Sequence, residues 1–170
     1  MLKKLFGKFT RHEAEIYGTL SKEEVKGVAS MLRKAVTVAL NHEGVKEKTH
    51  VDIMLTDNAH IHEINREQRG VDRPTDVLSF PMNELSEGSF DPEVCEVDLD
   101  SDKLLLGDMV LNLQRCAQQA EDFGHSYDRE ISYLTVHSVL HLLGYDHLDE
   151  GARKKAMRAR EDAIMDVLGL

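Results

Sequence analysis

Apolar residues recur at helical spacing in several stretches of the chain and at alternate positions in others. Between residues 22 and 40 the apolar positions lie three or four residues apart, and Ser21 precedes them with Glu24 three residues later. Serine followed by glutamate at this spacing forms a capping box at the start of a helix. The pattern therefore predicts an amphipathic helix over residues 22–40.

After residue 50 the spacing of the apolar residues changes to alternate positions, which is typical of strands. Apolar residues occupy every second position from residue 51 to 55, which predicts a short half-buried strand. Asp57 or Asn58 can cap the helix that follows, and Gly70 ends it. The remaining pattern predicts a strand over 76–81, an edge strand within 95–100, a buried strand over 104–113, and helices over 114–123, 127–143 and 149–168.

This order predicts an α+β fold. Strands gather in the middle of the chain and helices flank them, so we expect one domain over residues 1–170, with a small mixed sheet covered by helices. A chain of 170 residues is of ordinary length for a single core. We expect a loose basic N-terminus over residues 1–15 and an acidic insertion over residues 83–103.

The net charge of the chain limits which partners the protein could bind. The formal net charge is -10, which argues against nucleic acid because lysine and arginine contacts with phosphates supply most non-specific affinity. However, residues 83–103 hold 8 of the 31 acidic residues, with Lys103 as their only base. The acidity is largely local. No apolar run is long enough to span a membrane and no secretory signal is evident, so we expect a cytoplasmic protein without membrane contact.

Three histidines fall within eleven residues near the end of the chain. His137 and His141 are four residues apart, so they share one face of a helix. Gly144 tolerates the left-handed conformation that ends a helix, and the turn can bring His147 to the same point. Neutral imidazole is a preferred zinc ligand. We therefore predict one Zn2+ ion on a helix and the turn after it, held by His137, His141 and His147.

Three protein ligands leave a fourth position for water, as in catalytic zinc sites. Zinc lowers the pKa of bound water and polarises phosphoryl or carbonyl oxygens, so the pattern predicts a hydrolase. The same spacing occurs in metzincin peptidases, but their motif has glutamate directly after the first histidine as general base. Ser138 occupies that position here and cannot act as a base near neutral pH, which disfavours a peptidase.

The chain also resembles a known family, the YbeY endoribonucleases, which are bacterial rRNA maturation factors. The matching blocks span about residues 50–150. They are Asn65 through Pro81, with its Pro-Thr-Asp-Val-Leu-Ser-Phe-Pro run, then Leu106-Gly107-Asp108, then Gly124-His125-Ser126, and Glu130 through His147. This combination is far more specific than the histidines alone.

The resemblance implies a single-strand-specific, zinc-dependent endoribonuclease that matures the 3′ end of small-subunit rRNA and takes part in ribosome quality control. Its implied partners are single-stranded RNA or rRNA and the ribosome or its small subunit, with no DNA expected. It implies that His137, His141 and His147 bind zinc, and that Arg69 matches the arginine of the family's active cleft. We assign catalysis to Arg69 and His141.

Two features qualify this assignment. Without the resemblance, Arg69 would be interpreted as a member of an ordinary surface ion pair. The family usually has glycine where this chain has Ser138, and we expect the hydroxyl to be tolerated in packing.

Two nucleophiles are consistent with the sequence, namely water and the 2′-hydroxyl of the RNA. A second hypothesis is a metal-stabilised ribosome-binding factor without significant cleavage, and a third is a metallopeptidase.

Overall fold

The computed structural model describes residues 11–146 and 151–170. Its elements, in chain order, are β1 (His12–Gly18), α1 (Lys22–His42), β2 (Thr49–Thr56), α2 (Asn58–Arg69), β3 (Val77–Pro81), the 3-10 turn η1 (Pro92–Val94), β4 (Glu96–Asp98), β5 (Lys103–Asn112), α3 (Leu113–Phe123), α4 (Tyr127–Leu142) and α5 (Ala152–Leu168). The fold is α+β with a mixed sheet, as the sequence predicted.

The sheet has the strand order β1-β2-β5-β3, and β4 pairs with an end of β5. β1, β2 and β5 are parallel neighbours, whereas β3 and β4 run antiparallel to β5. β5 is therefore the strand that joins the two parts of the sheet. Its side chains are buried along most of its length, as expected for a strand with neighbours on both sides.

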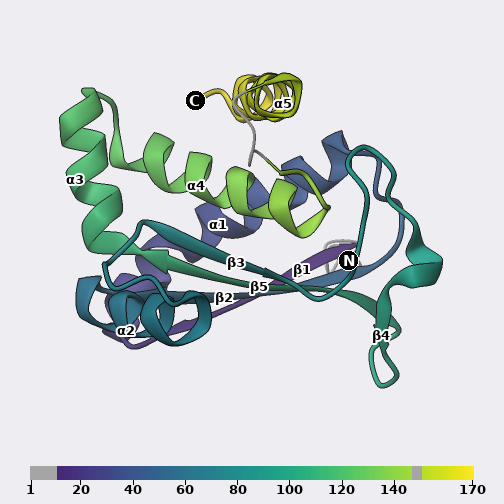
Figure 1. The fold of residues 1–170 in the computed structure, drawn as a ribbon, viewed down its shortest axis with the longest axis horizontal. Helices are drawn as coiled ribbons and strands as arrows, with labels where there is room; N and C mark the ends of the chain where they lie inside the picture. The colour runs from purple at the N-terminus through teal and green to yellow at the C-terminus, as the bar shows by residue number, and fades with distance from the viewer. Residues whose placement is uncertain (1–10, 147–150) are drawn as a thin grey trace, which may run out of the picture.

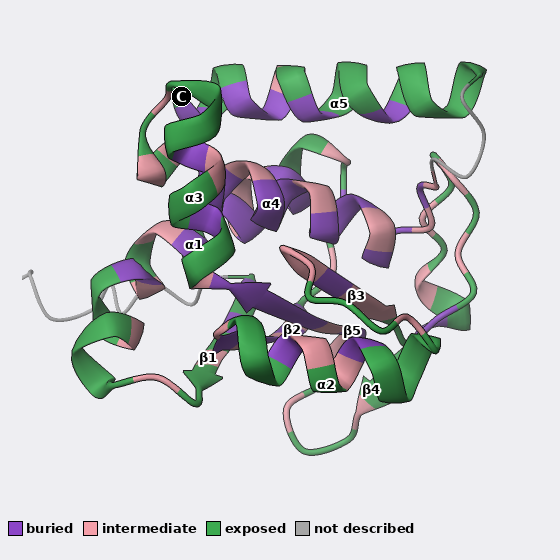
Figure 2. Ribbon diagram, turned by 60° about the vertical axis from the view of Figure 1, so that its left-hand side comes forward, coloured by how far each residue is buried: buried purple, intermediate pink, exposed green. Residues whose placement is uncertain are grey.

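The helices form layers over the sheet (Figure 1). α1 and α4 pack against each other over one face, and α5 lies outside them, against α4. α2 lies on the opposite face, where Ile61 packs with Leu78 and Val110 in a small second core. The main core lies between the sheet and the pair α1 and α4. Figure 2 shows α5 with buried positions facing α4 and exposed positions facing outward.

The predicted helix boundaries are confirmed by their caps. The Ser21 hydroxyl accepts the Glu24 backbone N–H at 3.3 Å, and the Glu24 carboxylate accepts the Ser21 backbone N–H at 3.0 Å. The Asp57 carboxylate accepts the His60 N–H at 3.0 Å, which begins α2. Gly70 ends α2 in the left-handed conformation with φ of 67°. Local side-chain chemistry therefore sets where these helices begin and end.

The prediction of a loose N-terminus was wrong from residue 12 onward. His12–Gly18 forms β1, which pairs in parallel with β2. His12 is buried, and its imidazole bonds the Thr49 hydroxyl at 2.9 Å and the Asn41 side chain at 3.2 Å. This strand owes its place to pairing with a distant segment, which a short charged stretch does not reveal. Residues 1–10 lie outside the described residues.

The acidic insertion is anchored to the sheet at its start. Asn83 is buried, its side-chain amide donates to the Leu105 carbonyl at 2.7 Å, and its side-chain oxygen accepts the Glu96 N–H at 2.8 Å. β4 follows as a short edge strand with exposed charges, as the alternation predicted. The first residues after β3 are thus held in a defined position. None of the helices in the described ranges is long and apolar enough to cross a membrane.

Two glycines are required by close backbone contacts. Gly107 in β5 has φ of 131°, and a Cβ there would lie 2.3 Å from the Phe80 carbonyl oxygen of β3. Gly144 follows α4 with φ of 88°, and a Cβ there would lie 2.2 Å from the Leu85 carbonyl oxygen. The positive φ of Gly144 confirms the left-handed turn predicted after α4, the helix that carries His137 and His141. The contact with Leu85 also fixes the distance between that turn and the segment after β3.

We expect Gly107→Ala to lower the free energy of unfolding by about 2–4 kcal/mol, because the new methyl group collides with a carbonyl in a strained conformation. Urea denaturation measures this change. Gly27→Ala is the control, since a Cβ at Gly27 in α1 meets nothing within 4 Å. It should stabilise the protein by about 0.5–1 kcal/mol. Equal effects of the two substitutions would contradict the assigned packing.

Candidate metal centre and cleft

A cleft of about 650 Å³ opens between the end of α2, strand β3 and the C-terminal half of α4. It contains Arg69, His137 and His141, three of the four residues to which the sequence assigned chemistry. The full lining is Arg69, Thr75, Asp76, Val77, Ser79, Pro81, Asn83, Glu84, Leu85, His137, His141, Gly144, Tyr145 and Asp146. The fourth residue, His147, lies outside the described residues.

His137 and His141 face each other across one turn of α4. Their Nε2 atoms are 3.1 Å apart, and their rings are nearly perpendicular, with an interplanar angle of 84°. Both side chains are half-buried and line the cleft. The helical spacing therefore brings two imidazoles to one point, as the sequence predicted for these two residues.

Hydrogen bonds on the other side of each ring fix this orientation. His137 Nδ1 lies 2.6 Å from a carboxylate oxygen of Glu161, and His141 Nδ1 lies 2.9 Å from the Tyr145 carbonyl. A carbonyl only accepts, so His141 Nδ1 carries a proton, and an ionised Glu161 requires the same of His137. Each neutral ring then directs the lone pair of its Nε2 atom toward the other ring.

This arrangement fits a metal ion. Two lone pairs directed at one another at 3.1 Å repel unless a proton or a metal ion lies between them. Tetrahedral zinc with Zn–N bonds of about 2.0–2.1 Å places its nitrogen ligands roughly 3.3 Å apart. The donor set is neutral imidazole, and each ring is oriented by an oxygen acceptor at Nδ1, as is usual for ligating histidines. His137 and His141 can therefore hold such an ion.

Glu161 is the site residue that sequence reasoning missed. It lies on α5, is buried, and accepts hydrogen bonds from His137 Nδ1 and from the Tyr133 hydroxyl at 2.8 Å. Burial by itself raises the pKa of Glu161, but these two hydrogen bonds, together with the charges of His137 and Arg158, outweigh it, and its pKa is lowered. The sequence position of Glu161 could have indicated this role, because this acidic residue falls on the apolar stripe of α5 between Met157 and Ile164.

Arg69 is the last residue of α2 and lines the cleft that contains the two histidines. No acidic group forms an ion pair with its guanidinium among residues 11–146 and 151–170. The ordinary surface ion pair therefore does not account for this side chain. An exposed guanidinium without an acidic partner is suited to binding an anion such as phosphate.

Ser138 is fully buried behind the cleft. Its hydroxyl lies 2.7 Å from that of Ser79 on β3, which does line the cleft. The additional hydroxyl is thus accommodated by a hydrogen bond between α4 and β3. Its direction, toward the sheet, also keeps it from serving as a base in the cleft.

The other acidic residues of the matching motifs have different partners. Both oxygens of Asp76 are engaged, one by the Val77 N–H at 2.8 Å and the other by the Gln119 amide at 3.0 Å. Glu130 is buried next to His125 at 3.1 Å, and burial raises its pKa. Asp76 therefore holds the start of β3, and Glu130 forms an ion pair with His125.

A separate group of potential metal ligands lies on the opposite face of the sheet. Glu15 of β1 and His50 and Asp52 of β2 have ligand atoms within 4.8 Å of one another. Asp52 is beside Asp108 in the pairing of β2 with β5, and the pKa of Asp108 is raised by burial and by Asp52. The sequence did not predict this group, because it depends on the register of β1 with β2.

Comparison with known proteins gives the family. A family model described as "Endoribonuclease YbeY" matches residues 16–169. The chain belongs to the YbeY endoribonuclease family. A relative from Clostridium botulinum named "Endoribonuclease YbeY" is 48% identical over 145 residues, which are 82% of this chain and 87% of that protein. The protein of the same name from Desulfitobacterium hafniense is 43% identical over 152 residues, which cover 89% and 92% of the two chains. The YbeY match includes every described residue of the cleft.

The fold is also shared with a solved structure. A protein from Thermotoga maritima, determined in solution, superimposes with a TM-score of 0.58 at 24% sequence identity. The alignment covers 91% of this chain and 87% of that one. This likeness supports the fold alone. The resemblance to YbeY proteins that the motifs indicated is thus confirmed by the family model and by the relatives.

We expect Glu161→Gln to lower the free energy of unfolding of chelator-treated protein by about 1–3 kcal/mol, because one amide oxygen replaces two acceptors and leaves a buried donor without its partner. Urea denaturation measures the loss. Asp162→Asn is the control, since this exposed neighbour makes only a 3.9 Å contact with Arg158. It should change stability by less than about 0.5 kcal/mol. A similar small effect of both would show that Glu161 does not hold His137.

Proposed function

We propose that this protein is a single-strand-specific, zinc-dependent endoribonuclease that acts in the cytoplasm on rRNA. The observation that carries the proposal is one cleft that contains two facing imidazoles and an arginine with no acidic partner among residues 11–146 and 151–170. The relatives' printed name supports RNA as the substrate. Within that activity we propose maturation of the 3′ end of small-subunit rRNA and a part in ribosome quality control.

His137, His141 and His147 are the proposed ligands of the zinc ion. The facing Nε2 atoms of His137 and His141 support this proposal, whereas His147 lies outside the described residues. When bound, zinc supplies a Lewis acid that activates water and withdraws charge from a phosphodiester oxygen. The protein contributes the orientation of the rings, because Glu161 and the Tyr145 carbonyl hold their Nδ1 atoms.

Arg69 is the proposed phosphate-binding residue. Its guanidinium is always charged and can donate two parallel hydrogen bonds to phosphate oxygens. Its location at the end of α2 places it in the cleft with the imidazoles, so a bound phosphodiester would lie between them. The alternatives for the nucleophile are water and the 2′-hydroxyl of the RNA. A 2′,3′-cyclic phosphate at the product end would exclude direct attack by water.

A second candidate is a ribosome-binding factor that contains metal but does not cleave RNA. The net charge of -10 favours this function, because an acidic protein gains little non-specific affinity for free RNA. The two functions differ in what they demand of Arg69. A nuclease requires it for phosphate binding, whereas a binding factor would assemble ribosomes without it. A metallopeptidase is disfavoured because the buried Ser138 hydroxyl faces Ser79.

The decisive test is cleavage of a labelled single-stranded RNA by nuclease-free protein, with zinc measured in the same samples. Wild type should cleave. His141→Ala should lose both cleavage and zinc, and Arg69→Ala should keep zinc while its kcat/KM falls by roughly 10²–10³-fold. Arg66→Ala is the matched control, because it removes the same charge from α2 at a position outside the cleft lining.

Equal cleavage by all four proteins would identify a contaminating nuclease and refute the assignment. If wild type binds zinc but does not cleave, the ribosome-binding factor becomes the better account. Normal ribosome maturation in cells that carry Arg69→Ala would support that alternative.

A further inference from the structure

A second hollow, distinct from the cleft, lies between the first residue of α2, the segment that follows α2, and the start of α3. It has a volume of about 620 Å³ and is lined by Asn58, Arg73, Pro74, Gln114, Arg115 and Gln118. The lining contains two arginines, three amides and no acidic residue. Such a composition is notable in a chain whose net charge is -10. It indicates a local preference for anions.

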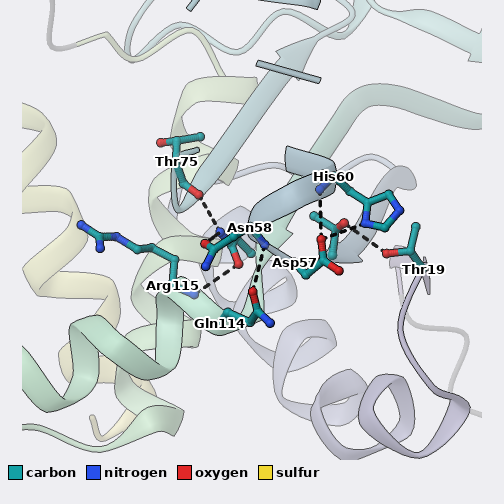
Figure 3. Close-up of polar contacts among 9 residues, drawn as sticks. Thr19, Asp57, Asn58, His60, Thr75, Gln114 and Arg115 are labelled. Atoms are coloured by element: carbon teal, nitrogen blue, oxygen red, sulfur yellow. Dashed lines mark hydrogen bonds and ion pairs between the residues drawn. The ribbon is translucent and has the colours of Figure 1, made fainter. Parts of the chain in front are cut away.

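The two arginines are available to a ligand. Neither Arg73 nor Arg115 forms an ion pair with an acidic residue in the part of the chain that the structure describes. The backbone N–H of Arg115 is capped by the Asn112 side chain at 3.2 Å, and Figure 3 shows its side chain extending away from that cap. Guanidinium groups and neutral amide donors are the groups with which proteins hold phosphate and sugar oxygens.

The hollow is continuous in sequence with the cleft. Arg73 and Pro74 line the hollow, and the next residues, Thr75 and Asp76, line the cleft. This segment is held from both sides. The Asn65 side chain donates to the Arg73 carbonyl at 2.8 Å. The Asn112 side chain donates to the Thr75 carbonyl at 3.0 Å, and Figure 3 labels Thr75. A strand of RNA that follows this segment would pass from the hollow into the cleft.

The length of α2 gives the distance from Arg69 in the cleft to Asn58 in the hollow. Asn58 is the first residue of α2 and lines the hollow, whereas Arg69 is the last and lines the cleft. At a rise of 1.5 Å per residue these positions are roughly 16 Å apart along the helix. A dinucleotide bound at Arg69 would not reach Asn58, but a longer strand would.

We propose that this hollow binds the backbone of single-stranded RNA several nucleotides away from the scissile bond, through Arg73 and Arg115. The site rests on the proposed nuclease function and explains how an acidic protein gains affinity for RNA. It predicts that affinity depends on RNA length. Only strands long enough to occupy both the cleft and the hollow benefit from the two arginines.

The test uses the full chain and two fluorescein-labelled single-stranded RNAs, one of about 15 nucleotides and one of about 2. Affinity is measured by fluorescence anisotropy over a range of salt, with EDTA present to prevent zinc-dependent cleavage. For Arg73→Ala/Arg115→Ala, we expect affinity for the long RNA to fall roughly tenfold or more, and the slope of log affinity against log salt to shrink by roughly 1.4. Affinity for the short RNA should not change.

Lys26→Ala/Lys34→Ala is the matched control. It removes two exposed positive charges from α1, and these lysines line neither the cleft nor the hollow. It should bind both RNAs like wild type. With zinc restored, the arginine variant should raise KM for the long RNA and leave kcat within about twofold, whereas Arg69→Ala lowers kcat/KM for both lengths.

The outcomes separate the two claims. If Arg73→Ala/Arg115→Ala binds the long RNA like wild type, or loses the short RNA equally, the hollow is not an RNA site, and the nuclease assignment is unaffected. If the control weakens binding as much as the arginine variant, only general charge matters and the proposed site is refuted. If wild type neither binds nor cleaves either RNA, both proposals fail together.

Discussion

The orientation of two imidazole rings is the constraint on which the rest of the site depends. His137 and His141 face each other at 3.1 Å because an acceptor behind each ring holds its Nδ1 atom. One acceptor is a buried carboxylate from α5, and the other is the backbone of the turn after α4. The last helix is therefore more than a cover for α4. It carries a charge whose burial is offset by the hydrogen bonds that it receives from α4 and by the nearby charges of His137 and Arg158.

The segment from Arg69 to Leu85 forms the facing wall of the cleft. It includes the end of α2, strand β3 and the start of the acidic insertion. Its position is fixed by contacts that leave no room for side chains, since a Cβ at Gly107 or Gly144 would collide with its carbonyl groups. It is also fixed by Asp76, both of whose oxygens are engaged. A rigid wall of this kind holds Arg69, the proposed phosphate-binding residue, at a set distance from the imidazoles, as the proposed catalysis would require.

Much of this could be predicted from the sequence because its causes are local. Caps such as Ser21 and Asp57, the spacing of His137 and His141, and the turn at Gly144 each depend on a few adjacent residues. What was missed depends on distant pairing. β1 exists through its register with β2, and the group of Glu15, His50 and Asp52 requires the same two strands to align. Glu161 meets His137 only after α5 packs on α4. Periodicity marks which face of an element is buried, but not which partner lies opposite it.

The most direct test of the account is X-ray absorption spectroscopy at the zinc edge on metal-loaded wild type, His141→Ala and His50→Ala. The account predicts imidazole nitrogens at about 2.0–2.1 Å from zinc in wild type and in His50→Ala, and loss of bound zinc in His141→Ala. Zinc that is retained in His141→Ala but lost in His50→Ala would place the metal at the group formed by Glu15, His50 and Asp52. That result would contradict the assignment of the histidine cleft as the metal centre.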